Sequence, residues 1–232
     1  MKTGKFKVAV NFSTSVPVGV SDEDEHNYLQ TLNGQIIAKT DDKTKECGIP
    51  IGKTRAFYLN LELRYKRKDN LFTCLDLSQN SVDYCMPLMD VGKDDFERKL
   101  YRLFDDNLYG SNVLVLDKLE IFPQHRGKRI GLAVLRATIE IFSHGCAMAV
   151  MRPMPLQFVD TNNEQPPKND QYALHLFTVD KRTGLRRLMN YYGMLGFVRY
   201  GKTGLMVLNP CNEMPSLEKL GCPEDGYYKI EY

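Results

Sequence analysis

One nine-residue stretch has the composition of an anion-binding turn. Residues Pro123 to Gly131, PQHRGKRIG, place three positive side chains and two glycines between a strand-like run, Asn112 to Phe122, and an apolar run, Ile130 to Phe142. If the apolar run is a helix, the N–H groups of its first turn have no intrahelical partner and its dipole favours an anion. Glycine also lets a phosphate approach the backbone closely. On spacing alone, an anion site and a solvated basic turn explain the stretch equally well.

A second phosphate-like motif fails on spacing and on context. CGIPIGKT, Cys47 to Thr54, puts a cysteine where a Walker loop needs its first glycine. Pro50 stiffens the loop, and a strand-like run follows where the motif needs a helix. We therefore predict a turn here and not a nucleoside-triphosphate site.

The first stretch is similar to a known cofactor-binding signature. LEIFPQHRGKRIGLAVL resembles the acyl-CoA-binding segment of the GNAT superfamily of N-acyltransferases, in which an R/Q-x-x-G-x-G/A loop joins a strand to a helix. Arg126 takes the R/Q position and Gly131 the final glycine, but Arg129 stands where the middle glycine usually is. The loop still works if residue 129 keeps helical φ/ψ and its side chain points to solvent or to phosphate. Downstream, YGMLGF, Tyr192 to Phe197, resembles the Y-x-x-x-G-F segment of the family.

The resemblance implies a CoA thioester, acetyl-CoA or another acyl-CoA, as co-substrate. Its pyrophosphate would take backbone N–H groups from the loop, namely those of Arg126, Gly127, Lys128, Arg129, Ile130 and Gly131. The strand before the loop, at Glu120 to Phe122, would offer N–H groups to the thioester and the pantetheine arm, with Ile121 as the donor to the carbonyl oxygen. The activity implied is transfer of an acetyl group to a primary amine by direct attack.

Two side chains are candidates for proton transfer. Tyr192 resembles the tyrosine that protonates the CoA sulfur; it shares a helical face with Leu185 and Leu188, whereas Tyr191 is rotated by about 100°. A half-buried packing aromatic is the alternative. Glu120 is our candidate for the general base. Asp117, three residues earlier, should face the other side of the sheet. A solvated surface carboxylate and a water-relayed base are the alternatives for Glu120.

The elements that must position these residues indicate an α/β (α+β) fold, a GNAT-like mixed central sheet flanked by helices. In the second half the periodicity predicts a strand, a helix, a strand, a helix and a closing hairpin, at 112–122, 130–142, 146–157, 183–195 and 197–208. A loop is expected at 159–170.

The first half looks β-rich. Asn33-Gly34 is typical of a hairpin turn, Arg55 to Lys66 alternates like a long strand, and Leu71 to Leu77 would pair with that strand. A helix is expected over Asp94 to Asp106. We read residues 1–232 as one domain, with a β-rich half at 1–111 on the acceptor side, an acyl-CoA-binding core at 112–208 and a tail at 209–232.

Composition narrows the class of protein. The net charge is +2 and the pI about 8.1, which is less basic than a duplex-coating nucleic-acid binder. The six cysteines form no C-x-x-C pair, so we expect neither a zinc site nor disulfides. We also expect a cytoplasmic protein, without a segment that spans a membrane. The sequence leaves the amine acceptor open between a small molecule, a peptide and an aminoacylated carrier. It also leaves open whether the protein forms a homodimer. Two other functions also stay open: a non-catalytic acyl-CoA-binding module and a nucleic-acid binder that uses basic runs such as Arg64 to Lys68.

Overall fold

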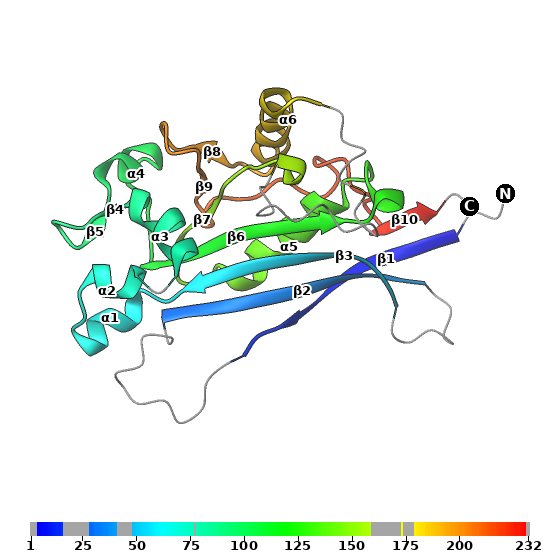
Figure 1. Cartoon of the computed structure of the whole chain (residues 1–232). Coiled ribbons are helices and arrows are strands. Elements are labelled where there is room, and N and C mark those ends of the chain that lie inside the picture. The colour runs from blue at the N-terminus through cyan, green and yellow to red at the C-terminus, as the bar shows by residue number, and fades with distance from the viewer. Residues whose placement is uncertain are drawn as a thin grey trace.

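The computed structural model describes residues 4–15, 28–40, 48–76, 78–158, 173 and 179–230. Within them, eight strands form one mixed sheet in the order β10-β1-β2-β3-β6-β7-β9-β8 (Figure 1). These strands are β1 (Gly4–Ser13), β2 (Leu29–Lys39), β3 (Ile49–Leu59), β6 (Asn112–Ile121), β7 (Cys146–Met151), β8 (Val198–Arg199), β9 (Met206–Leu208) and β10 (Tyr227–Ile230). Among them only β6 and β7 run parallel, and every other neighbouring pair is antiparallel.

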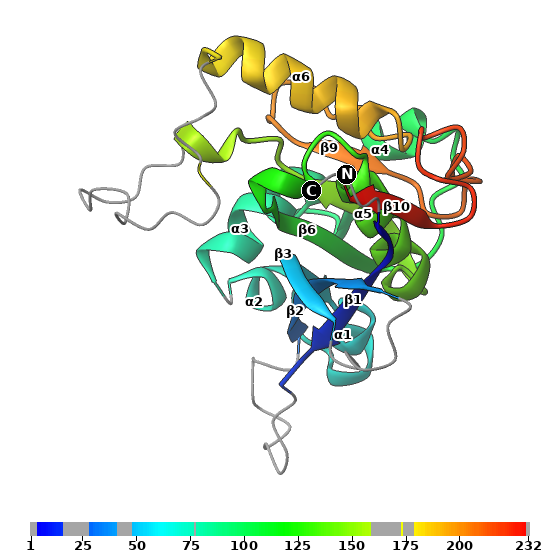
Figure 2. The same ribbon diagram turned by 90° about the vertical axis from the view of Figure 1, so that its right-hand side faces the viewer.

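Helices cover both faces of this sheet. They are α1 (Glu62–Arg67), α2 (Leu71–Leu75), α3 (Gln79–Cys85), α4 (Arg98–Leu103), α5 (Ile130–Phe142) and α6 (Lys181–Gly193), with single turns η2 (Met86–Leu88), η3 (Pro123–His125) and η4 (Leu156–Phe158) and a short ribbon of β4 (Met89–Asp90) and β5 (Asp95–Phe96). Figure 2 shows α5 on one side of the sheet, α2 and α3 on the other, and α6 crossing above β6. The mixed α+β class is as the sequence predicts.

The alternation of β6 divides the core between the two faces. Val113 and Val115 belong to the cluster that α1 to α4 cover, whereas Leu114 and Leu116 face α5. α5 has the predicted bounds, and its apolar residues reach two clusters: Leu132 and neighbours pack beside β6 and β7, while Ile130 and Val134 pack beside β1, β2 and β3. A helix apolar on most sides is buried on most sides, as expected.

The first half is less β-rich than the sequence suggests. Asn33-Gly34 forms no turn, because β2 runs straight through it; Gly34 lies between Phe12 and Thr54, and a Cβ there would come 2.6 Å from the Thr54 side chain. The long strand predicted over residues 55–66 ends at Leu59, where β3 stops. Helices α1 and α2 replace its continuation and its partner, since the buried residues there recur at helical spacing. The predicted helix at 94–106 shortens to α4.

The tail closes the sheet on its far edge. β10 pairs antiparallel with β1, and the Tyr228 ring lies 5.7 Å from the Phe6 ring. The expected loop at 159–170 and Cys47 lie outside the described residues. No helix within the described ranges is long and apolar enough to cross a membrane.

Candidate functional site

The two parallel strands separate at the middle of β6. Their register ends at the pair Leu116 and Met151. On β6 the ladder with β3 skips Asp117, which is the extra residue of a β-bulge and bends the strand. On the other side, Pro153 and Pro155 follow β7 and have no N–H group to continue a ladder. The sequence therefore builds a gap between the second half of β6 and the chain that leaves β7.

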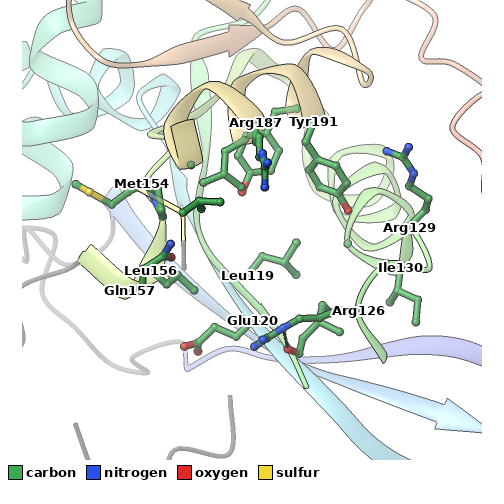
Figure 3. A pocket seen from close by; sticks show the side chains of 18 of the residues that line it. Leu119, Glu120, Arg126, Arg129, Ile130, Met154, Leu156, Gln157, Arg187 and Tyr191 are labelled. Atoms are coloured by element: carbon green, nitrogen blue, oxygen red, sulfur yellow. Dashed lines mark hydrogen bonds between the residues drawn. The ribbon is translucent and has the colours of Figure 1, made fainter. Parts of the chain in front are cut away.

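A cavity of about 400 Å³ fills this gap. Its floor is β6 from Leu119 to Ile121, one wall is the loop that enters α5, the opposite wall is the segment Met154 to Gln157, and α6 forms the roof (Figure 3). Leu119 points into the cavity from below, and Arg187 and Tyr191 point down from α6. Segments far apart in the chain thus enclose a mostly apolar space with polar groups at its rim.

The backbone of Ile121 is turned towards the cavity. The Phe122 N–H donates to the Ile51 carbonyl at 2.8 Å, and Gly52 is the residue opposite Ile121. In an antiparallel ladder successive residues point their N–H groups to opposite sides, so the Ile121 N–H points away from β3, into the gap. The Ile121 carbonyl, on the same side, accepts from Arg126 Nε at 2.9 Å. Arg126 therefore ties the loop to the end of the strand.

The loop before α5 contains two left-handed residues. Gly127 has φ +76°, and a Cβ there would meet open space; Arg129, the N-cap of α5, has φ +61° and ψ +9°. Our condition that residue 129 keep helical φ/ψ is wrong: Arg129 adopts the left-handed conformation, which favours glycine. This geometry costs about 1 kcal/mol for a residue with a Cβ. The Arg129 carbonyl accepts from the Leu132 N–H at 3.0 Å, which helps to fix the loop.

The start of α5 leaves backbone donors beside the cavity. The side chain of the N-cap residue, Arg129, makes no cap hydrogen bond, so it leaves the first N–H groups of the helix, at Ile130 and Gly131, uncapped. A Cβ on Gly131 would lie 2.7 Å from the Tyr191 hydroxyl oxygen and 3.1 Å from Leu119 Cδ2. Gly131 therefore allows α6 and β6 to approach the helix end closely.

Both neighbouring tyrosines of α6 line the cavity. The rings of Tyr191 and Tyr192 lie 5.6 Å apart, edge to face. Burial raises the pKa of Tyr192 to about 12, and burial, followed by the proximity of Tyr192, raises the pKa of Tyr191 as well. Each therefore carries its proton at neutral pH. The sequence-based prediction missed Tyr191 as a site residue. Tyr191 follows Gly184 by seven positions and Leu188 by three, so the spacing places it on the helix face of these two cavity-lining residues.

Glu120 lines the cavity as a buried carboxylate held by two ammonium groups. Its side chain is 5% exposed, and Lys53 Nζ and Lys118 Nζ lie 3.2 Å from its two oxygens. The carboxylate of Asp117 accepts a hydrogen bond from Arg55 Nε, at 2.6 Å from its Oδ2. Because Lys53 and Arg55 are two apart on β3, both carboxylates lie on the same face of the sheet. The prediction of opposite faces is wrong because the bulge at Asp117 shifts the alternation.

The remaining candidates divide into two groups. Phe122 and Lys128 do not line the cavity, and Lys128 Nζ donates instead to the Lys229 carbonyl of β10 at 2.8 Å. Arg129 lies at the rim (Figure 3), and its guanidinium is 3.1 Å from Met194 Sδ. Sequence reasoning missed Arg187, a third arginine at this cavity with Arg126 and Arg129.

His125 also lines the cavity, and one of its ring nitrogens is buried. Its Nδ1 is unpartnered among the described residues, and its ring packs edge-on against Phe6 at 5.7 Å. Burial, with a smaller contribution from Lys128, lowers its pKa.

Neither a metal-binding cluster among the described residues nor a similar protein identifies the chemistry of this cavity. Within the described ranges, no three His, Cys, Asp or Glu side chains are grouped to hold a metal ion. Comparison of the chain with protein-family models, with curated proteins and with solved structures finds no match.

Proposed function

We propose that this protein is a CoA-dependent N-acetyltransferase with a GNAT-like fold, acting in the cytoplasm, that transfers an acetyl group from acetyl-CoA to a primary amine. The observation that carries the proposal is the gap between the parallel strands β6 and β7, which opens directly beside the N-terminus of α5. A thioester needs a narrow space with a backbone donor, and its pyrophosphate needs an anion site. The Ile121 backbone and the N-terminus of α5, which would suit these two needs, border the same cavity.

The residues around the cavity fit the two ends of such a co-substrate. Gly127 leaves open space in front of its backbone, and the first N–H groups of α5 are available beside it, so a pyrophosphate can be held there. Arg187 adds positive charge from the roof. At the other end, the Ile121 N–H points into the gap and would donate to the thioester carbonyl oxygen.

The proton transfers fall to a tyrosine and a carboxylate. Attack by the amine nitrogen on the thioester carbon forms the C–N bond and breaks the C–S bond. Tyr192, protonated at neutral pH because burial raises its pKa to about 12, gives its proton to the departing sulfur. Glu120 accepts the proton that the amine loses. Lys53 and Lys118 hold that carboxylate at the cavity edge.

Turnover with release of free CoA thiol tests the proposal. In a thiol-detection assay with acetyl-CoA and a panel of primary amines, we expect Tyr192→Phe to lower kcat by about a hundredfold, the usual contribution of a general acid, with acetyl-CoA affinity unchanged. Tyr191→Phe, which removes the neighbouring hydroxyl from the same cavity, is the matched control and should keep kcat within about threefold of the wild type. Equal losses in the two variants would remove Tyr192 from its role.

One observation favours a second function, a non-catalytic acyl-CoA-binding module. Glu120 is almost fully buried and already paired with two lysines, which suits a structural carboxylate as well as a base. The same assay separates the two functions: acetyl-CoA binding without any amine-dependent thiol release supports the binding module.

A further inference from the structure

A second, polar groove lies on the sheet face opposite α5. It measures about 580 Å³ and crosses four adjacent strands, β1, β2, β3 and β6. It is lined by residues 11–13, 33–35 and 53–55, with Lys118 at the end. The strand registers place one set of alternate side chains from these runs on the same face: Asn11, Ser13, Asn33, Gln35, Lys53 and Arg55. Arg55 fixes which face this is, because its guanidinium lies over the Phe57 ring, which packs in the cluster beneath α1 to α4. In Figure 1 those helices gather at one end of the sheet.

The groove presents positive charge and neutral hydrogen-bonding groups, and no carboxylate is among the described residues that line it. The side chains of Lys53, Arg55 and Lys118 are 53%, 45% and 39% exposed, whereas their partners Glu120 and Asp117 are 5% and 10% exposed. The cations therefore face solvent and the carboxylates lie beneath them. Among the described residues these three cations lie over two carboxylates, which leaves one positive charge in excess there, and carboxamides beside them suit the oxygens of an anion.

The groove and the cavity meet at Glu120. Lys53 and Lys118 line the groove, and both lie 3.2 Å from the carboxylate of Glu120, which lines the cavity at the open edge of β6. A small molecule with its anionic group in the groove can therefore place a group a few bonds away beside Glu120. Glu120 is the residue that the proposed function assigns as the base for the amine.

We propose that the acceptor is a small primary amine that carries an oxyanion, a carboxylate or a phosphate, and that Lys53, Arg55 and Lys118 bind this oxyanion. The assignment rests on the proposed function and adds the chemical class of the acceptor. It also gives the charge pairs on the sheet a role in specificity, since the two lysines that hold Glu120 would also bind the substrate.

A matched series of acceptors tests the assignment. Aminohexanoate, aminohexyl phosphate, aminohexanamide and diaminohexane each carry a primary amine on a six-carbon chain and differ at the other end. Diaminohexane has a second amine there, so its kcat/KM is compared per amine. We expect kcat/KM for the carboxylate or the phosphate to exceed that for the neutral amide by about tenfold, the effect of a few half-exposed charge contacts. The ratio between carboxylate and phosphate identifies the oxyanion. Equal rates for all four, or a preference for the diamine, would overturn the assignment.

Two substitutions test the groove without breaking an ion pair. Asn33 and Gln35 lie opposite Arg55 and Lys53 in the β2–β3 register, so Asn33→Asp with Gln35→Glu places carboxylates beside the cations and adds cross-strand pairs. The double variant should fold and bring the preference for the oxyanion to within about twofold of unity. Asn212→Asp, an exposed position lining a different groove, is the control with the same charge chemistry and should keep the tenfold preference.

Calorimetric titration of the same protein with acetyl-CoA separates the two proposals. If acetyl-CoA binds and the amines react without preference, the acceptor assignment is wrong and the acetyltransferase stands. If acetyl-CoA does not bind, both are wrong. Binding in the double variant with the affinity of the wild type shows that any change in acceptor preference arises in the groove.

Discussion

Gly52 should be the glycine least able to accept a side chain near the site. A Cβ at this position would lie 2.2 Å from the Glu120 carbonyl oxygen and 3.2 Å from Ile121 Cα, both backbone atoms of the neighbouring strand. A backbone cannot rotate away as a side chain can, so β3 and β6 must separate. Overpacking usually costs about 1–3 kcal/mol, and we expect Gly52→Ala at the upper end, near 3 kcal/mol. For a chain of this size that lowers Tm by roughly 6–12 °C.

Chemical and thermal unfolding measure this cost. The chain has no tryptophan, so far-ultraviolet circular dichroism in a urea series is the suitable signal. Gly193→Ala in α6 is the matched control, because a Cβ there meets nothing within 4 Å and alanine is the better helix former. We expect the control to match or slightly exceed the wild type. A Gly52→Ala protein whose free energy of unfolding lies within about 0.5 kcal/mol of the wild type would refute the reasoning, as that is the size of a surface change.

Three further predictions concern the loop, its histidine and the tyrosine. Because Arg129 has a left-handed backbone, the free energy of unfolding of Arg129→Gly should be about 1 kcal/mol higher than that of Arg129→Ala in the same urea assay. Equal values would contradict backbone strain at residue 129. Burial lowers the pKa of His125 in the folded protein. As the pH falls below about 6.5, the unfolded chain therefore takes up a proton before the folded chain does, and the free energy of unfolding decreases. His125→Phe should lose less stability than the wild type between about pH 7 and 5, measured by urea midpoints at each pH. Since the pKa of Tyr192 is raised to about 12, this tyrosine stays protonated and kcat should not fall through its ionisation up to about pH 10. A fall of kcat below pH 10 that is absent in Tyr192→Phe would contradict the role of Tyr192 as the acid.

The core of the fold was predictable where local patterns agree with burial. The run from Ile130 to Phe142 is apolar on most sides and forms α5 with those bounds, and the strand before it is β6. The short alternating segments after Leu59 are ambiguous between strand and helix, and packing under the sheet decides for helix. The pairing of β10 with β1 joins residues more than 200 positions apart and has no local signal.

The site was predictable at the level of its loop but not of its geometry. The spacing around Arg126 and Gly131 marks the turn at the end of a strand, yet nothing in the letters says that Arg129 takes a positive φ. The bulge at Asp117 depends on the ladder with β3, so the alternation rule misplaces this residue relative to Glu120. Contacts across elements, which bring Tyr191 against Gly131, appear only when the chain is folded.

Amide hydrogen exchange, with and without acetyl-CoA, locates the co-substrate on the protein. We propose that the thioester and the pyrophosphate of acetyl-CoA lie between the second half of β6 and the start of α5. We predict that saturating acetyl-CoA slows exchange in peptides that cover Leu119 to Ile121 and Gly127 to Gly131, and leaves the amides of β1 unchanged. If acetyl-CoA does not bind, or if it binds and protects other segments while these two exchange as before, the account of the site is wrong.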